Sequence, residues 1–323
     1  MRAPAIQTSR WLTSWKPTSS GPASIVPDME VKRSLLGMLT LGMILCGCFD
    51  TPNEEHVSDA TTTTPPDPDA HYAYTQEELF VERGENQIYG ILYLPQDVQG
   101  PLPAVIYAHG YGGTHQNGTA YAQVLAEKGY AVYCFDFCGG SPDSQSVGST
   151  LDMSIFTEQE DLMAVIDAIG SREDIDPSHL YLLGSSQGGV VSAITAARQP
   201  DRIAGMILPY PAFILCEEAN SLFADAAAIP DSYYFLWMEV GRAYFEPLIG
   251  YDVYEDIGDY TKDVWILHGD ADTIVPLSSS KRAQDVYDHA ELLVLPGSGH
   301  GFYGDTQQEA IDAILGYLQD SYD

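Results

Sequence analysis

Gly184-Ser185-Ser186-Gln187-Gly188-Gly189 stands between an apolar run at residues 179–183 and a helix-like run at residues 190–198. A serine framed by glycines between a strand and a helix has the pattern of a nucleophile elbow. In such a turn the strained backbone presents the hydroxyl above the sheet, beside the positive end of the helix, and glycines let the turn close. Ser186 is the serine selected, because only it has glycine two residues before and two residues after it. A glycine-rich turn without chemistry is the alternative.

An acid and a histidine follow the serine in that order, each in a loop after an apolar run. The run at residues 264–267 leads into a loop that contains Asp272, and the run at residues 292–295 leads into a loop that contains His300. Loops at the carboxyl ends of strands form the face where open α/β sheets bind ligands. An imidazole suits proton transfer at neutral pH, and a buried carboxylate fixes its tautomer. We therefore predict Ser186 as the nucleophile, His300 as the base and Asp272 as the residue that orients the base.

Two further residues compete for the last two roles. His268 precedes a glycine at the end of a predicted strand, where a histidine is more typical of a structural hydrogen-bonding group. Asp270 lies two residues before Asp272, and a carboxylate at that place is also typical of a local turn bond. On the residues alone both remain alternatives.

A glycine-rich loop after an earlier strand supplies the next part of the expected site. Residues 103–108 read as a buried strand, and His109-Gly110-Tyr111-Gly112-Gly113 follows. Hydrolysis through a serine needs two backbone N–H groups aimed at the developing negative charge. We predict that the N–H groups of Gln187 and Tyr111 form this oxyanion hole, and that the Tyr111 ring also lines the acyl pocket. A loop without this role is the alternative.

The chain resembles the α/β-hydrolase superfamily over about residues 77–320, and within it the bacterial cinnamoyl and feruloyl esterases and their carboxylesterase relatives. The stretches that carry the resemblance are His109-Gly110-Tyr111-Gly112-Gly113, Phe135-Asp136-Phe137-Cys138-Gly139-Gly140-Ser141, Ser186-Gln187-Gly188-Gly189-Val190-Val191 and His268-Gly269-Asp270-Ala271-Asp272-Thr273-Ile274-Val275-Pro276. The resemblance implies an α/β fold with a mostly parallel central sheet flanked by helices, and a small cap insertion between strands 6 and 7. It places the acid at Asp272, three residues after the His-Gly pair. Cys138 and Gly140 depart from the family, whose members usually carry a polar residue and a histidine there.

Alternating strand-like and helix-like runs agree with a parallel sheet. An antiparallel hairpin is expected around Gly84, and a helix at residues 157–169 with Thr157 and Glu160 as its capping box. The connection at about residues 212–262 is long and rich in aromatic residues, so we predict a cap there. Any one of these rings can serve as core of the cap, but together they favour an apolar or aromatic acyl group. The residues expected to contact the substrate are Tyr111, Tyr234, Trp237 and Phe302.

The N-terminal part of the chain differs in composition from the rest. A basic pair and a short apolar run precede a Leu-Cys-Gly-Cys segment, which is typical of an export signal and resembles a bacterial lipobox with Cys48 as the lipidated residue. We predict an export or lipoprotein signal at residues 1–48, of which residues 1–28 read as a gene-model extension. A disordered linker at residues 49–75 and a hydrolase domain at residues 76–323 follow. The protein is then exported and anchored by a lipid, with secretion or an uncleaved anchor as alternatives.

Composition argues against several classes of partner. The formal net charge is −32, with 46 acidic and 14 basic residues, which disfavours nucleic acid and polyanionic substrates. Such acidity favours solubility, and a high-salt habitat is the more specific hypothesis. Cys134, Cys138 and Cys216 follow the export segment; free buried thiols are the expectation, with a bridge between the last two as the alternative. No residue spacing indicates a metal site, and we expect no cofactor.

The sequence therefore predicts a serine esterase that cleaves small or medium carboxylic esters through an acyl-enzyme. Hydroxycinnamate (feruloyl-type) esters are what the resemblance implies. A peptidase or acyltransferase with the same three residues is one alternative, and a surface-tethered binding protein without catalysis is another. The expected partner is a small-molecule ester, and the membrane enters only through the lipid anchor.

Overall fold

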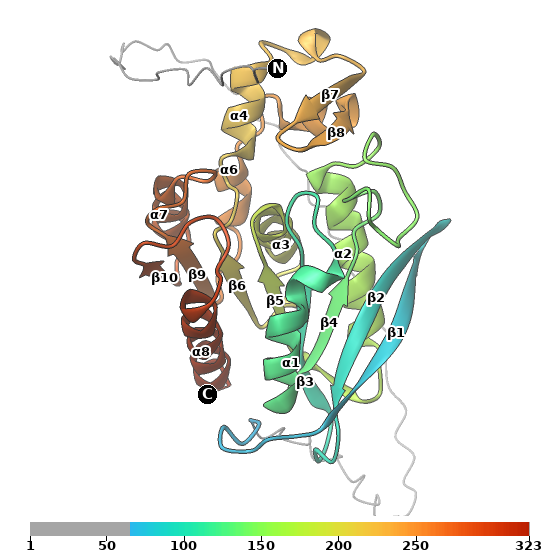
Figure 1. Cartoon of the computed structure of the whole chain (residues 1–323), viewed down its shortest axis with the longest axis vertical. Helices are drawn as coiled ribbons and strands as arrows, with labels where there is room; N and C mark the ends of the chain where they lie inside the picture. The colour runs from blue at the N-terminus through green and yellow to red at the C-terminus, as the bar shows by residue number, and fades with distance from the viewer. Residues whose placement is uncertain (1–64, 323) are drawn as a thin grey trace, which may run out of the picture. The chain divides into compact units, whose positions relative to one another are not determined.

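An eight-stranded sheet forms the centre of the computed structural model, which describes residues 65–322 (Figure 1). Its strands are β1 (Tyr74–Arg83), β2 (Asn86–Pro95), β3 (Leu102–Ala108), β4 (Ala131–Phe135), β5 (Ile175–Gly184), β6 (Gly205–Pro209), β9 (Val264–Gly269) and β10 (Ala290–Leu295). In space the order is β1-β2-β4-β3-β5-β6-β9-β10. The pairs β1/β2 and β2/β4 are antiparallel and the other pairs are parallel. The predicted mostly parallel sheet and the opening hairpin around Gly84 are confirmed.

Helices cover both faces of this sheet (Figure 1). One face is packed by α1 (Thr119–Glu127) and α8 (Asp305–Asp320), and the other by α2 (Ile155–Gly170), α3 (Gln187–Arg198) and α7 (Leu277–Val286). Alternate residues of each central strand serve the two faces: Val105 and Tyr107 of β3 belong to the first, and Ala104 and Ile106 to the second. Parallel strands buried on both sides read as nearly continuous apolar runs, which is why the sequence indicates them.

The strand order reverses between β3 and β5. The chain passes from β3 to β4 on one side and from β5 to β6 on the other, so a crevice opens between the carboxyl ends of β3 and β5. The register pairs Ala108, the last residue of β3, with Gly184, the last residue of β5. The loop at residues 109–113 and the turn at Ser186 therefore begin side by side.

The chain between β6 and β9, residues 210–263, forms an insertion that we call the cap insertion. Its elements are α4 (Leu215–Leu222), η2 (Ala226–Ala228), β7 (Ser232–Phe235), β8 (Met238–Gly241), α5 (Arg242–Phe245), η3 (Glu246–Leu248) and α6 (Val253–Ile257). In Figure 1 it lies at the end of the sheet where the parallel strands finish. Several of its rings pack on one another as a local core, namely Phe223, Tyr233, Phe235 and Phe245.

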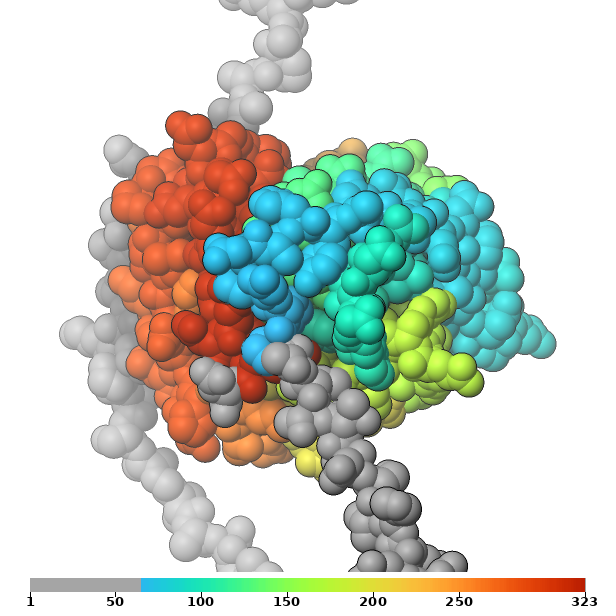
Figure 2. Space-filling view, turned by 90° about the horizontal axis from the view of Figure 1, so that it is seen from below, coloured from blue at the N-terminus to red at the C-terminus, as the bar shows by residue number. Residues whose placement is uncertain are grey.

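The first described residues are folded against the domain, contrary to the linker prediction for residues 65–75. The Tyr72 N–H donates to the Glu127 carbonyl at 2.8 Å, and the Lys128 ammonium donates to the Pro68 carbonyl at 2.8 Å. Figure 2 shows this segment, in blue, on the surface of the domain. Composition misses these bonds because in this segment they are made by backbone groups, the Tyr72 N–H and the Pro68 carbonyl. The predicted export segment, with Cys48, and the linker up to residue 64 lie outside the described residues.

Helix α2 begins two residues earlier than the sequence predicts. Ser154 has extended backbone and caps the helix, since its hydroxyl accepts from the Thr157 N–H at 3.2 Å. The Thr157 hydroxyl accepts from the Ser154 N–H at 2.8 Å in return. The capping box is therefore Ser154 with Thr157, and the predicted box of Thr157 with Glu160 is wrong. Glu160 pairs with Arg83 instead.

The three described cysteines, Cys134, Cys138 and Cys216, are buried free thiols, as the sequence favours. The alternative bridge between Cys138 and Cys216 is not formed. Within residues 65–322, none of the helices has both the length and the apolar character that crossing a membrane requires.

The turn from β5 into α3 has no room for side chains. A Cβ on Gly188 would lie 2.2 Å from the Ala108 carbonyl oxygen and 2.4 Å from that of His109. A Cβ on Gly184 would lie 2.4 Å from the Gly188 carbonyl oxygen. These neighbours are backbone atoms of a strand end and a helix end, so they cannot move aside. The glycines of the motif are therefore required by the close approach of α3 to β3.

Gly188→Ala should destabilise the domain by about 1–3 kcal/mol, because the added methyl group must push α3 away from β3. Urea or thermal unfolding measures the change. Gly316→Ala is the matched control, since a Cβ at this position of α8 meets no atom within 4 Å. The control should be neutral or stabilising by less than about 1 kcal/mol. Equal effects of the two substitutions would contradict the packing argument.

Candidate active site

Ser186 occupies the strained turn between β5 and α3. Its φ is 53°, in the left-handed region that residues other than glycine rarely adopt. The turn is fixed on both sides: the Ser186 N–H donates to the Pro209 carbonyl at 3.1 Å, and its carbonyl accepts from the Ala212 N–H at 2.9 Å. The Ser185 hydroxyl, by contrast, is buried and lies 2.9 Å from the Tyr107 hydroxyl. Both serines line the cleft, but of the two only Ser186 has a hydrogen bond to His300.

His300 contacts Ser186 through one ring nitrogen and Asp272 through the other. Nε2 lies 3.0 Å from Ser186 Oγ, and Nδ1 lies 2.8 Å from Asp272 Oδ2. Because an ionised carboxylate can only accept, Nδ1 carries the hydrogen and Nε2 accepts from the serine hydroxyl. The imidazole is thus held in the tautomer that can take the serine proton. The structure brings the three predicted residues together in one chain of hydrogen bonds.

Asp272 is a buried carboxylate surrounded by donors. The N–H groups of Ile274 and Val275 donate to Oδ1 at 2.8 and 2.9 Å. His268 and His300 contact Oδ2 at 3.3 and 2.8 Å. Burial favours the neutral acid, but these hydrogen bonds outweigh burial and hold the pKa of Asp272 well below its usual range. The side chain therefore stays ionised beside His300.

His268 and Asp270, the two competing residues, have structural partners. The His268 ring is fully buried; Nδ1 accepts from the Ser280 hydroxyl at 2.7 Å, and Nε2 donates to the Val275 carbonyl at 3.0 Å. The Asp270 carboxylate accepts from the Gly297 N–H at 2.6 Å. His268 is thus a structural hydrogen-bonding group and Asp270 makes a bond to a neighbouring loop. His268 also contacts Asp272 and helps to hold its carboxylate.

Two backbone N–H groups beside Ser186 have no partner within the described chain, those of Tyr111 and Gln187. Tyr111 follows β3 and Gln187 is the first residue of α3, so both lie at the crevice. A Cβ on Gly110, next to Tyr111, would come within 2.9 Å of the Ser186 Cβ, which shows how closely the loop approaches the serine. The positive end of α3 adds to the attraction for negative charge at this point.

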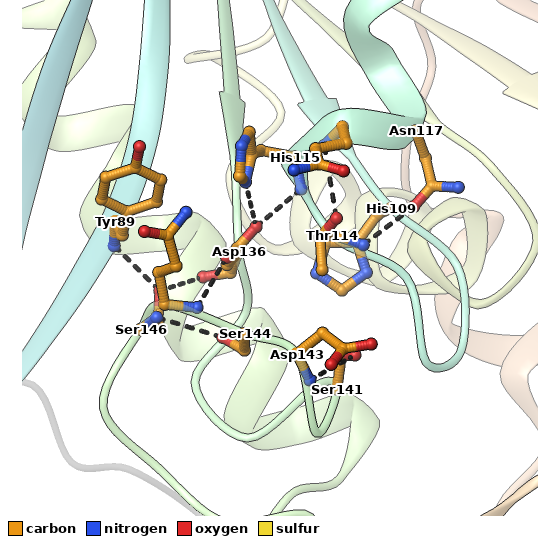
Figure 3. Close-up of polar contacts among 12 residues, drawn as sticks. Tyr89, His109, Thr114, His115, Asn117, Asp136, Ser141, Asp143, Ser144 and Ser146 are labelled. Atoms are coloured by element: carbon orange, nitrogen blue, oxygen red, sulfur yellow. Dashed lines mark hydrogen bonds and ion pairs between the residues drawn. The ribbon is translucent and has the colours of Figure 1, made fainter.

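The sheet and its adjoining loops hold the chain on both sides of the loop at residues 109–113, and Figure 3 shows the contacts on the far side, between His115 and Asp136. At its start, His109 Nε2 accepts from the Phe137 N–H at 3.0 Å, while Nδ1 donates to the Gly110 carbonyl at 2.8 Å. Burial lowers the pKa of His109 to about 4, so this ring stays neutral. Beyond the loop, Asp136 accepts from the His115 N–H at 2.6 Å and from His115 Nδ1 at 2.7 Å. These bonds fix where the loop begins and ends.

A cleft of about 310 Å³ opens over Ser186 and His300. Seven of its sixteen lining residues are aromatic, namely Tyr107, Tyr111, Tyr121, Tyr210, Trp237, Phe302 and Tyr303. Tyr111, Trp237 and Phe302 thus lie where the sequence predicts substrate contacts. Tyr234 does not line the cleft: its side chain is 68% exposed, because alternation along β7 turns Phe235 inward and Tyr234 outward.

The sequence matches the prolyl oligopeptidase family over residues 116–323, which is more than half of the chain. The chain belongs to this family. Among solved structures, Est1E from Butyrivibrio proteoclasticus with ferulic acid bound has a TM-score of 0.69 and 25% identity. That likeness covers 75% of this chain and 98% of Est1E.

Two curated relatives match shorter segments of the chain than the family match does. The quorum-quenching protein AidA of Acinetobacter baumannii is 33% identical over 110 residues, 34% of this chain and 35% of AidA. Human monoglyceride lipase is 28% identical over 129 residues, 40% of this chain and 41% of the lipase. The matched segments span less than half the length of these two relatives. Fold and matches together identify an α/β-hydrolase of esterase- or lipase-like type that resembles feruloyl esterases and carboxylesterases.

Tyr210 is a residue of the site that sequence reasoning misses. Its ring lies edge-on to His300 and to Phe302, with ring centroids 4.8 and 4.9 Å apart. Its φ of 38° is strained for a tyrosine, and such strain concentrates at functional sites. The one signal in the sequence is its position between Pro209 and Pro211, both of which restrict the local backbone.

Glu158 of α2 is the second residue near the site that sequence reasoning misses. Its carboxyl group is 1% exposed and accepts from Gln187 Nε2 at 2.8 Å. Burial raises the pKa of Glu158 to about 8; the bond from Gln187 partly opposes this rise, and the nearby charge of Asp161 adds to it. Glu158 is therefore mostly protonated at pH 7 and places little negative charge beneath the free N–H groups.

Glu158→Gln should stabilise the domain increasingly as the pH rises. The folded pKa of about 8 lies above the ordinary value of 4.5, so wild-type stability falls between these pH values, where the unfolded chain has already released the proton. Glutamine keeps an acceptor for Gln187 and has no proton to release. The difference in free energy of unfolding between variant and wild type should grow by up to a few kcal/mol from pH 5 to pH 8. Tm measured across this pH range follows the change.

Glu173→Gln is the matched control, because Glu173 is exposed. Its difference from wild type should stay constant over the same pH range. A Glu158→Gln difference that is equally constant would contradict a protonated Glu158.

Proposed function

We propose that this chain is a serine esterase that hydrolyses carboxylic esters through an acyl-enzyme on Ser186. The observation that carries the proposal is the continuous hydrogen-bonded chain from Asp272 through His300 to Ser186 at the floor of a cleft. Two unpartnered N–H groups, of Tyr111 and Gln187, stand beside the same serine. A nucleophile, a base, an orienting carboxylate and an oxyanion site are the set that acyl transfer requires.

Each step of the mechanism uses one of these groups. His300 Nε2 takes the Ser186 proton as Oγ attacks the ester carbonyl carbon, and the carbonyl electrons move onto the oxygen. The N–H groups of Tyr111 and Gln187 donate to this oxyanion. When the carbonyl re-forms, the alkoxide leaves with the proton from His300. Water then attacks the acyl-enzyme by the same route, with His300 as base, and releases the acid and Ser186. Ionised Asp272 stabilises the imidazolium in both halves.

The aromatic cleft supports an aromatic acyl group, and we propose hydroxycinnamate esters as the substrate class. Tyr121, Tyr210 and Phe302 present ring faces and edges in a space of about 310 Å³, which suits one substituted ring rather than a long alkyl chain. The likeness to Est1E, whose structure holds ferulic acid, agrees with this class. A peptidase is the second candidate, because of the name of the family.

Ser186→Ala should reduce turnover of p-nitrophenyl butyrate by at least about 10³-fold, because no other group can form the acyl-enzyme. Ser185→Ala is the matched control: its hydroxyl bonds Tyr107 away from His300, so turnover should fall by less than about 10-fold. Spectrophotometric assay of the released nitrophenol measures both variants. Full activity of Ser186→Ala, or equal loss in the two variants, would refute Ser186 as the nucleophile.

The substrate class is tested by comparing kcat/KM for methyl ferulate, p-nitrophenyl butyrate, p-nitrophenyl palmitate and a prolyl p-nitroanilide. We expect the first two to exceed the palmitate by at least about 10-fold, since the cleft is too small for a long chain. We expect no measurable turnover of the anilide. Faster cleavage of the anilide than of either short ester would favour the peptidase instead.

A further inference from the structure

Both residues that supply the proposed oxyanion donors have side chains that reach into the cap insertion. The Tyr111 hydroxyl donates to the carbonyls of Phe235 and Met238, at 3.0 and 3.3 Å, which flank the turn between β7 and β8. The Gln187 side chain accepts from the hydroxyl of Tyr244, in α5 of the same insertion, at 2.7 Å. The two donors come from opposite sides of the crevice, yet one segment holds both.

Gln187 is clamped between two elements. Its amide nitrogen donates to Glu158 on α2 at 2.8 Å, and its amide oxygen accepts from Tyr244 at 2.7 Å. Gln187 is 1% exposed and Tyr244 is fully buried, so neither bond competes with water. In a buried environment, leaving one of these amide groups without its partner costs about 1–3 kcal/mol of stability. The orientation of the Gln187 side chain is therefore well determined. Its backbone N–H is the first of α3 and moves with the side chain's attachment point.

Tyr111 is the only large side chain in its loop, whose other members after His109 are glycines. Gly112 has φ of 68°, a conformation open mainly to glycine. Polar contacts from the main domain hold the chain on both sides of this loop, at His109 and at His115; Figure 3 shows those of His115 with Asp136. The peptide that carries the Tyr111 N–H is held on its carbonyl side, where Gly110 accepts from His109 Nδ1 at 2.8 Å and from the Gly113 N–H at 2.9 Å. The contacts of the Tyr111 ring add a second restraint on the same residue.

Those contacts are with the cap insertion. The Tyr111 ring lies 5.6 Å from Phe235, 5.5 Å from Trp237 and 5.6 Å from Tyr244, between ring centroids. Tyr244 therefore touches Tyr111 and hydrogen-bonds Gln187 at the same time. It joins the two donors from the side opposite the sheet.

We propose that the cap insertion sets the geometry of the oxyanion hole, with the hydroxyl groups of Tyr244 and Tyr111 as positioning groups for the N–H groups of Gln187 and Tyr111. This inference rests on the proposed esterase chemistry. Neither hydroxyl touches the reacting atoms. The Tyr244 hydroxyl acts by holding Gln187, and the Tyr111 hydroxyl acts by anchoring Tyr111 to the cap insertion. Loss of either hydroxyl weakens binding of the transition state and leaves binding of the substrate unchanged, because the donors are needed only once the oxyanion forms.

The experiment compares Tyr244→Phe and Tyr111→Phe with wild type in the full chain. The probes are p-nitrophenyl butyrate for kcat and KM, and a short alkyl trifluoromethyl ketone, whose adduct with the serine carries an oxyanion. Each variant should lower kcat by about 10- to 100-fold with KM within about 2-fold, and weaken inhibition by the ketone by the same factor as kcat. Tm is measured for every variant, since removal of one hydroxyl keeps the ring and its packing.

Tyr254→Phe is the matched control. Tyr254 belongs to the same insertion, is also buried, and its hydroxyl donates to the Ser279 carbonyl on α7 at 3.2 Å. Its loss loosens the insertion without touching either donor, so kcat and ketone inhibition should stay within about 2-fold of wild type. If Tyr244→Phe and Tyr111→Phe match this control, or raise KM alone, the inference is overturned while the esterase proposal stands. A wild-type protein without ester turnover would overturn both.

A double-variant cycle separates positioning through Gln187 from general loosening of the insertion. Gln187→Leu removes the clamped amide and keeps the backbone N–H. Once this side chain is gone, Tyr244→Phe should lower kcat no further, because both substitutions break the same bond. Full multiplication of the two losses would show that Tyr244 acts by another route and would overturn its assigned role.

Discussion

The approach of α3 to the end of β3 is the contact on which the site depends. Gly188 lies so near the carbonyl of Ala108 that no side chain fits, and the chain can leave β5 only through a turn in which Ser186 takes a φ of 53°. The crevice between β3 and β5 opens at the same place, because their connections run to opposite sides. The N–H of Gln187 has no partner within the described chain because Gln187 is the first residue of α3, and the first N–H groups of a helix have no acceptor inside it.

Beside this contact, the sheet positions a carboxylate, that of Asp272, which burial alone would keep protonated and neutral. Asp272 follows β9 and His300 follows β10, so the strands fix the distance between carboxylate and imidazole. Burial opposes ionisation of Asp272, yet four donors keep the pKa low. One of them is His268, which the sequence offers as a competing base and the structure shows as support for the acid. The charge retained in this way is what stabilises an imidazolium at His300.

What the sequence predicts well depends on local pattern. Buried parallel strands give apolar runs such as residues 264–267, and the order of serine, acid and histidine points to the loops that the structure joins. The choice of Asp272 over Asp270 needs the family resemblance as well. Prediction fails where the direction of a side chain depends on distant packing. Tyr234 and Trp237 lie three residues apart, but only the hairpin turn decides that Trp237 reaches the cleft. Glu158 reads as an exposed acid until α2 packs against Gln187.

For the proposed esterase, the cap insertion connects substrate choice with the rate of reaction on one wall of the cleft. Trp237 lines the cleft, and the rings behind it, Tyr111 and Tyr244, carry the hydroxyl groups that hold the proposed donors. A substitution that reshapes this wall also shifts the N–H groups, so specificity and kcat change together there. Tyr121 and Tyr303 also line the cleft but lie outside the cap insertion, and within the described chain neither hydroxyl bonds a residue that supplies a proposed donor. For the proposed esterase, changes in acyl specificity at constant chemistry are therefore physically easiest at Tyr121 and Tyr303.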